Sequence, residues 1–131
     1  MRFFLTIFFC VFLSFLSFSQ GLMDPKNNTT RQDTLRGSIT AERSWWDLNY
    51  YHLDISVNPE KKYIEGSNLV YYTVLNSNNV LQIDLQEPLE LLMAKQEGEK
   101  LEIQKEGNAY FITLKKDQIL GSLEKIKLFY K

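Results

Sequence analysis

Apolar and polar residues alternate along most of the chain from Tyr50 onward, and turn-forming residues interrupt the alternation at short intervals. A period of two residues is typical of β-strands, in which successive side chains point to opposite faces of a sheet. In the first predicted strand one face carries Tyr51, Leu53, Ile55 and Val57, and the other carries Tyr50, His52, Asp54 and Ser56.

Turns at residues 58–62, 76–79 and 97–100 separate further alternating segments. These segments are residues 63–75, 81–85, 89–94, 101–105, 110–114 and 123–131. We expect segments 89–94 and 101–105 to form a hairpin around residues 97–100. Gly66 is expected to allow a bulge or a close approach of two backbones. No segment has a helical stripe longer than two turns.

About seven short strands with frequent turns predict an all-β fold, either an antiparallel β-sandwich or a saddle-shaped sheet. Residues 37–131 are long enough for one modest core and one domain. Lys131 ends an alternating strand with no turn after it. We therefore expect the last strand to lie at an open sheet edge or to remain unpaired, and the domain to be an incomplete fragment.

The first nineteen residues predict a cleaved signal peptide. Arg2 provides a positive charge, residues 3–18 form an apolar run, and Ser17 and Ser19 place small side chains before a cleavage site. The alternative is an uncleaved anchor, but this run is short for a hydrocarbon layer of ~30 Å. The residues before Cys10 are too large for a lipoprotein cleavage site. We expect a secreted or periplasmic protein without stable membrane insertion after cleavage.

Residues 20–36 are polar and show no period, which favours a flexible linker. Two overlapping N-glycosylation sequons begin at Asn27 and Asn28. They would be glycosylated in a eukaryotic secretory pathway, whereas in a bacterium they would form only a polar linker. We favour the polar linker. Removal of the leader takes away Cys10, so disulfides and thiolate metal ligands are excluded. The whole chain has a formal charge of −1, and the loss of Arg2 makes it more negative. No basic surplus indicates a nucleic-acid partner.

Residues 35–131 carry an ordered series of motifs. Arg43 precedes the pair Trp46-Asp47, then come Tyr51-x-Leu53-Asp54-Ile55, a turn with Pro59, and Ile64-x-Gly66; "LQIDLQEPLEL" and "IKLFYK" follow. This series resembles the N-terminal β-domain of the aminopeptidase N family of zinc metallopeptidases, most of all its secreted bacterial members.

The resemblance implies a parent enzyme whose chemistry lies in a following domain. There, two histidines of an HExxH motif and a later glutamate hold zinc, and the glutamate of the motif is the general base. The present chain has one histidine and no HExxH. We therefore predict no catalytic, cofactor-binding or metal-binding residue in this chain, and zinc only in a full-length parent. The family's substrate-anchoring residue from the β-domain corresponds to a position beyond residues 123–131.

The implied function is that of a non-catalytic scaffold within an exported aminopeptidase. Its partner is the catalytic domain of the same parent, and peptide substrates are reached through that parent. The alternative is a free-standing secreted β-sandwich that binds carbohydrate or protein through Trp45, Trp46 and exposed tyrosines.

Several residues are candidates for binding or catalysis, and each has a structural explanation. The two tryptophans fit a core or domain-contact role better than a stacking platform, and the spacing from Ser44 to Asp47 predicts a helical turn that presents them. His52 shares a strand face with Asp54, where a contact needs no catalytic purpose. Packing on a pleated sheet explains the tyrosines at positions 50, 51, 71 and 72.

Overall fold

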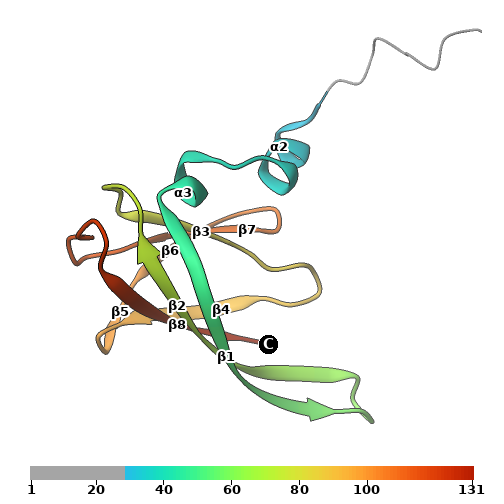
Figure 1. Cartoon of the computed structure of the whole chain (residues 1–131). Helices are drawn as coiled ribbons and strands as arrows, with labels where there is room; N and C mark the ends of the chain where they lie inside the picture. The colour runs from blue at the N-terminus through green and yellow to red at the C-terminus, as the bar shows by residue number, and fades with distance from the viewer. Residues whose placement is uncertain (1–28) are drawn as a thin grey trace, which may run out of the picture.

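The computed structural model describes residues 29–131. The expected leader and the sequon residues Asn27 and Asn28 lie outside the described residues. Two antiparallel sheets face each other, one of five strands in the order β1-β2-β8-β4-β5 and one of three in the order β3-β7-β6 (Figure 1). The prediction of an all-β antiparallel fold is confirmed. None of the helices in this part of the chain is long and apolar enough to cross a membrane.

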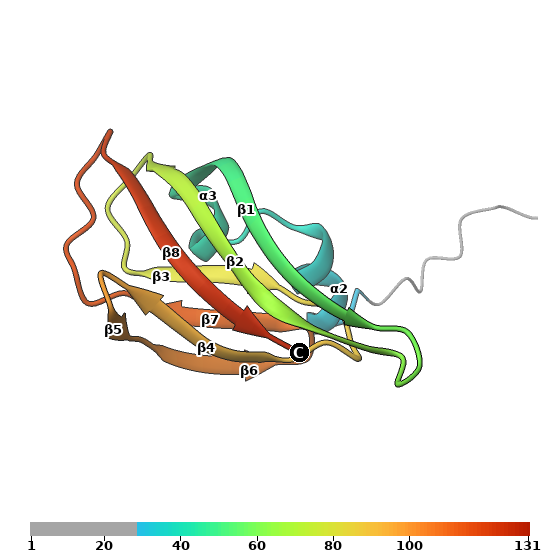
Figure 2. The same ribbon diagram turned by 90° about the horizontal axis from the view of Figure 1, so that it is seen from below.

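Figure 2 shows the layer of β1, β2 and β8 crossing over β3 and β7. The strands of the five-stranded sheet are β1 (Trp46–Asn58), β2 (Tyr63–Val74), β8 (Leu123–Tyr130), β4 (Leu91–Gln96) and β5 (Glu99–Lys100). Those of the three-stranded sheet are β3 (Val80–Asp84), β7 (Ala109–Thr113) and β6 (Glu102–Glu106). Two short helices, α2 (Arg31–Gly37) and α3 (Ala41–Ser44), precede the first strand.

The hydrophobic core fills the space between the two sheets. Alternate residues of β2 point into it, as the sequence pattern predicts. Its largest fully buried apolar and aromatic side chains are those of Trp45, Val70, Tyr72, Val74, Leu81, Tyr110, Ile112 and Ile126. The core thus draws on both sheets and on the segment just before β1.

Trp45 joins the two sheets. Its indole is 2% exposed, and Nε1 donates a hydrogen bond of 2.7 Å to the Val80 carbonyl at the start of β3. The ring edge meets Tyr72 of β2 with centroids 6.0 Å apart. The carbonyl of Trp45 also accepts from the backbone N–H groups of Leu75 and Asn76. One residue therefore fixes β3, β2 and the connection between them.

Three local predictions are wrong. The helical turn near Trp45 ends at Ser44 and begins after Thr40, so Ser44 does not cap a helix that contains the tryptophans. The predicted hairpin around residues 97–100 forms, but its extent is wrong: β4 pairs with the two residues of β5, and the pairing ends at the backbone hydrogen bond from Leu101 to the Ala94 carbonyl. Leu101 is 4% exposed and points into the core, and beyond it the chain crosses to the other sheet, where β6 pairs with β7.

The third correction concerns the last strand, β8, which we expected at an open edge. It lies in the middle of the five-stranded sheet, paired with β2 on one side and β4 on the other. Its position follows from burial, because Ile126 and Leu128 are both core residues. The two edges of this sheet are formed by β1 and β5.

Helix α2 differs from the expectation of a flexible linker over residues 20–36, since it occupies the end of that segment. Thr30 caps the helix through a capping box with Asp33: each side chain accepts a hydrogen bond from the other's backbone N–H. Leu35 is the one buried residue of the helix. A polar segment is therefore ordered by one capping motif and one apolar contact.

Gly66 permits a close approach of β1 and β2, as predicted. A Cβ atom at this position would overlap the carbonyl oxygen of Asp54 in the paired strand. No side chain fits without a shift of the backbone, so the glycine is required by the packing of this hairpin.

We expect Gly66→Ala to lower the free energy of unfolding by roughly 1–3 kcal/mol, the usual cost of forcing an extra carbon into a packed site. Gly37→Ala is the matched control, because a Cβ there meets no atom within 4 Å. Urea denaturation followed by tryptophan fluorescence measures both variants. Equal midpoints for the two variants would contradict this account of Gly66.

Candidate functional site

The two tryptophans do not form an exposed platform. Trp46 is partly buried, its Nε1 donates to the Glu42 carbonyl at 3.0 Å, and its ring meets Tyr72 edge-on at 5.8 Å. Trp45 is buried between the sheets. Their interpretation as packing residues is confirmed.

His52 lies on the exposed outer face of β1, opposite Leu69 of β2. Asp54 and Ser56 share that face, as the alternation predicts. Within residues 29–131, no group of three or more histidine, cysteine, aspartate or glutamate side chains is arranged to hold a metal ion. His52 thus stands without the additional ligands that a zinc site needs.

The four tyrosines are divided among three environments. Tyr72 is buried: its hydroxyl donates to Gln118 Oε1 at 2.8 Å and accepts from Gln96 Nε2 at 3.2 Å, and burial raises its pKa. Tyr50 and Tyr71 stack on the outer face with ring centroids 4.6 Å apart. Tyr51 points to the inner side, where burial again raises the pKa of its hydroxyl. Burial thus makes the hydroxyls of Tyr72 and Tyr51 harder to deprotonate.

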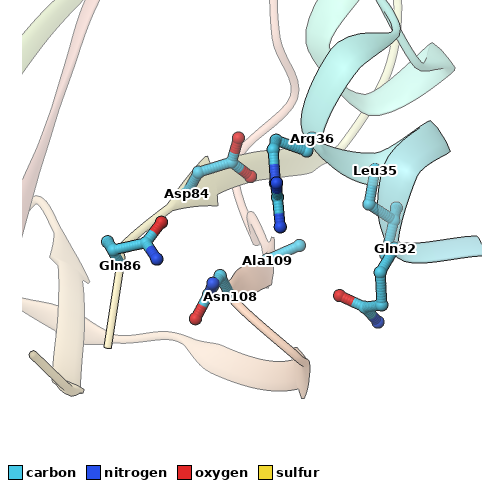
Figure 3. Close-up of a pocket in the computed structure, with 7 residues that line it drawn as sticks. All are labelled: Gln32, Leu35, Arg36, Asp84, Gln86, Asn108 and Ala109. Carbon is cyan, nitrogen blue, oxygen red and sulfur yellow. The ribbon is translucent and has the colours of Figure 1, made fainter. Parts of the chain in front are cut away.

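A polar cavity of about 160 Å³ lies between helix α2 and the three-stranded sheet (Figure 3). It is lined by Gln32, Leu35, Arg36, Asp84, Gln86, Asn108 and Ala109. Figure 3 shows the side chain of Arg36 extending from the helix toward Asp84 on the strand. A cation, a carboxylate and three amides in one cavity are groups that could bind a small polar ligand.

Asp84 and Asn108, two of the five polar side chains that line this cavity, have partners within the protein; Asn108 Oδ1 accepts from the Glu87 backbone N–H at 3.3 Å. Arg43 forms an ion pair with Asp84, whose carboxylate also accepts from Gln82 Nε2 at 2.9 Å. Gln82 is 2% exposed and also reaches the segment before β1: Oε1 accepts from Thr40 Oγ1 at 2.8 Å, and Nε2 donates to the Leu35 carbonyl at 3.3 Å. The cavity is therefore best understood as the seam that attaches α2 to the sheet.

A second contact holds the beginning of the helix. The Arg31 guanidinium donates two hydrogen bonds to Glu106, of 3.0 and 3.2 Å. The hydrogen bond and the charge of Arg31 lower the pKa of Glu106, and Glu106 in turn raises the pKa of Arg31. Both side chains are well exposed, so this pair positions the helix and adds little to global stability.

An apolar groove of about 290 Å³ lies where the sheets diverge. Its wall from β1 consists of Tyr51, Leu53 and Ile55, so three residues of the predicted apolar row share this side of the strand. They are about half exposed and do not belong to the core, and Val57 does not line the groove. The remaining lining residues are Asn68, Val70, Ile83, Asp84, Leu85, Leu89, Leu91, Leu128 and Tyr130. Asn68 Oδ1 is buried and has no hydrogen-bond partner.

Sequence reasoning missed both the seam and the far wall of the groove. In the sequence pattern, Gln82 is indistinguishable from an ordinary outward-facing strand residue. Leu85 and Leu89 are indistinguishable from residues at the ends of strands. The Thr30-x-x-Asp33 spacing was the one available indication of α2, because it matches a capping box apart from aspartate in place of glutamate.

Comparison with solved structures finds zinc metallopeptidases with the same fold. The M1 zinc metallopeptidase from Deinococcus radiodurans matches 66% of this chain with a TM-score of 0.59 and 17% identity. A mutant of that enzyme bound to a Tyr-Ser-Ala substrate matches 68% of this chain with a TM-score of 0.60 and the same identity. The matched region covers 20% and 21% of those chains, so this chain spans about a fifth of their length.

No family model matches the sequence, and no curated protein matches it. The likeness therefore establishes a fold related to part of a multi-domain metallopeptidase.

We expect Glu106→Gln to loosen α2 while leaving the sandwich intact, because the variant loses the charge that Arg31 pairs with. Hydrogen exchange of residues 31–37, read by mass spectrometry at neutral pH, should become a few-fold faster. The matched control is Glu102→Gln, an exposed glutamate on the same strand. Unchanged exchange in the Glu106 variant would show that this pair does not hold the helix.

Acid should have the same effect on the unmodified chain. Glu106 has a lowered pKa in the folded state, so its contribution is present above the pKa of the unfolded chain and is lost as the pH falls through the folded pKa. Asp33, whose pKa is lowered by its hydrogen bonds with Thr30, acts in the same direction. Exchange rates of α2, corrected for the intrinsic effect of pH, should therefore rise in acid before those of β2.

Proposed function

We propose that this chain is a non-catalytic N-terminal scaffold domain of an exported zinc aminopeptidase, which removes amino-terminal residues from peptides. The observation that carries the proposal is the structural match of about two thirds of the chain to about a fifth of an M1 zinc metallopeptidase. The ordered motifs between Arg43 and Gly66 support the same assignment, since they lie on α3 and the β1–β2 hairpin within this fold.

Zinc chemistry does not fit the residues of this chain. His52 is exposed on a strand face, and the described residues provide no cluster of ligands around it. We therefore derive no catalytic step here and assign zinc, the general base and peptide binding to the parent polypeptide. The role left to this domain is to support and cover the catalytic domain.

The outer face of the five-stranded sheet is suited to contact that domain. The opposite face of the sheet is already covered by β3, β6 and β7. The outer face presents the stacked pair Tyr50–Tyr71 and, farther along the sheet on β8, Phe129 with Lys127 Nζ 5.3 Å from its ring centroid. Aromatic side chains mixed with charged groups are common in interfaces between domains and between proteins. Scaffolding by this face would limit access to the cleft to short peptides.

The alternative is a free-standing secreted module for carbohydrate or protein. The apolar groove is the observation in its favour, because it provides a concave surface and an unsatisfied acceptor at Asn68. Its proposed stacking platform is lost, however, since Trp45 is buried in the core. The scaffold role accounts for more of the molecule.

An antibody against this chain tests the proposal in the source cells. In periplasmic or culture fluid, we expect it to capture a polypeptide several times longer than 131 residues that hydrolyses aminoacyl p-nitroanilides. A chelator should abolish this activity and zinc should restore it. The control is a parallel capture with an antibody of unrelated specificity. Capture of only the short chain, without activity, would overturn the proposal, as would zinc-dependent hydrolysis by the purified short chain itself.

A further inference from the structure

The outer edge of β1 is open along its whole length. β1 is the first strand of its sheet, and no other described strand pairs with its outer side. Every residue from Asp47 to Val57 is exposed, including Leu53 at 54% and Ile55 at 47%. Both ribbon views show the β1–β2 hairpin reaching beyond the rest of the sandwich (Figures 1 and 2). The strand therefore offers unpaired backbone groups next to exposed apolar side chains.

Natural proteins usually protect such an edge. Lysine, proline or a bulge in the edge strand prevents it from pairing with another chain. Residues 50–57 contain no lysine and no proline, and the one register shift of β1 comes earlier, between Leu48 and Tyr50. The free half of the strand is thus long, regular and open to pairing.

We propose that β1 pairs antiparallel with β1 of a second copy of this chain, with a twofold axis at Leu53. In this register Tyr51 lies opposite Ile55 of the second copy on the groove side. On the outer side His52 lies opposite Asp54 of the second copy. The symmetry repeats both pairs, so the interface gains two apolar pairs and two imidazole–carboxylate pairs.

Neighbouring registers lack this complementarity. An axis at His52 places the two imidazoles opposite each other, and an axis at Asp54 places the two carboxylates opposite each other. Directly opposed carboxylates repel each other and destabilise a sheet, whereas an imidazole N–H opposite a carboxylate can donate a hydrogen bond to it. An axis between two residues would pair apolar with polar side chains and mix the two faces. The sequence from Tyr51 to Ile55 therefore selects the axis at Leu53.

Pairing in this register also continues the apolar groove. The inner rows formed by Tyr51, Leu53 and Ile55 of the two copies become neighbours in one continuous sheet. Side chains that are about half exposed in the single chain then cover each other, which supplies apolar burial in addition to backbone hydrogen bonds. The dimer does not depend on the proposed scaffold role, because it uses the edge of the sheet and that role uses its outer face.

The first test measures mass in solution. The full chain is expressed with its own N-terminal segment and purified after any processing by the host. In analytical ultracentrifugation, the fraction of dimer should increase as the protein concentration rises. Leu53→Lys places two ammonium groups at the axis and should raise the dimer dissociation constant by at least about tenfold. Ile119→Lys makes the same chemical change at a position that is 66% exposed and outside both sheets, and should leave the dimer unchanged. A wild-type chain that stays monomeric, or equal effects of the two variants, would overturn the proposal.

The second test reads the register through charge. His52→Asp opposes two carboxylates, and Asp54→His opposes two imidazoles, so each variant alone should dimerise less than the wild type. An equimolar mixture should form a heterodimer, because every imidazole then meets a carboxylate. The doubly substituted chain, with both changes, should recover the wild-type dimer. Failure of both the mixture and the double variant to recover dimerisation would exclude this register even if some dimer forms.

Both tests include circular dichroism and thermal unfolding of each variant. These side chains are exposed, so the unfolding midpoint should stay close to that of the wild type. If Leu53→Lys unfolds the chain, Ile55→Lys replaces it, since Ile55 also lies in the interface and is exposed in the single chain.

Discussion

The contact on which the rest of the structure depends is that of Trp45 with both sheets. The core contains about a dozen side chains, and each of the two sheets buries only one face against it. Specific contacts are therefore needed to fix the position of one sheet relative to the other. The indole hydrogen bond to Val80 sets the position of β3, and the edge-on contact with Tyr72 sets that of β2. The backbone bonds from Leu75 and Asn76 fix the connection between these strands. The density of aromatic residues at the beginning of the domain is thus explained by packing, and binding is not needed to account for it.

Local patterns predicted the local structure, and non-local pairing lay beyond them. Alternation correctly indicated the faces of β1 and β2, and Gly66 correctly indicated a close backbone approach. The same alternation cannot tell which strands are neighbours, so β8 was expected at an edge although two core residues hold it in the centre. The break at Leu101 has a related cause, since a buried leucine between β5 and β6 reads as one more strand residue. Helix α2 was missed because a seven-residue polar segment with one buried leucine has no measurable stripe.

The candidate site shows the same limit. From composition alone, one histidine and the absence of an HExxH motif led to the prediction that this chain provides no metal ligands, and this stays a prediction. The seam beneath α2 could not be predicted, because Gln82 contacts residues more than forty positions earlier in the sequence. The residue type glutamine does not reveal whether its side-chain amide is exposed or is buried with three hydrogen-bond partners. Whether Gln82 is buried depends on the tertiary fold.

The molecule divides its surfaces according to what covers them. One face of the five-stranded sheet packs against the smaller sheet except along the apolar groove beside β1, and Gln82 forms internal hydrogen bonds at the seam beneath α2. The outer face and the β1 edge remain, and they differ in chemistry: the face offers side chains, whereas the edge offers backbone groups in a fixed direction. A partner that packs against side chains can therefore occupy the face without competing for the edge.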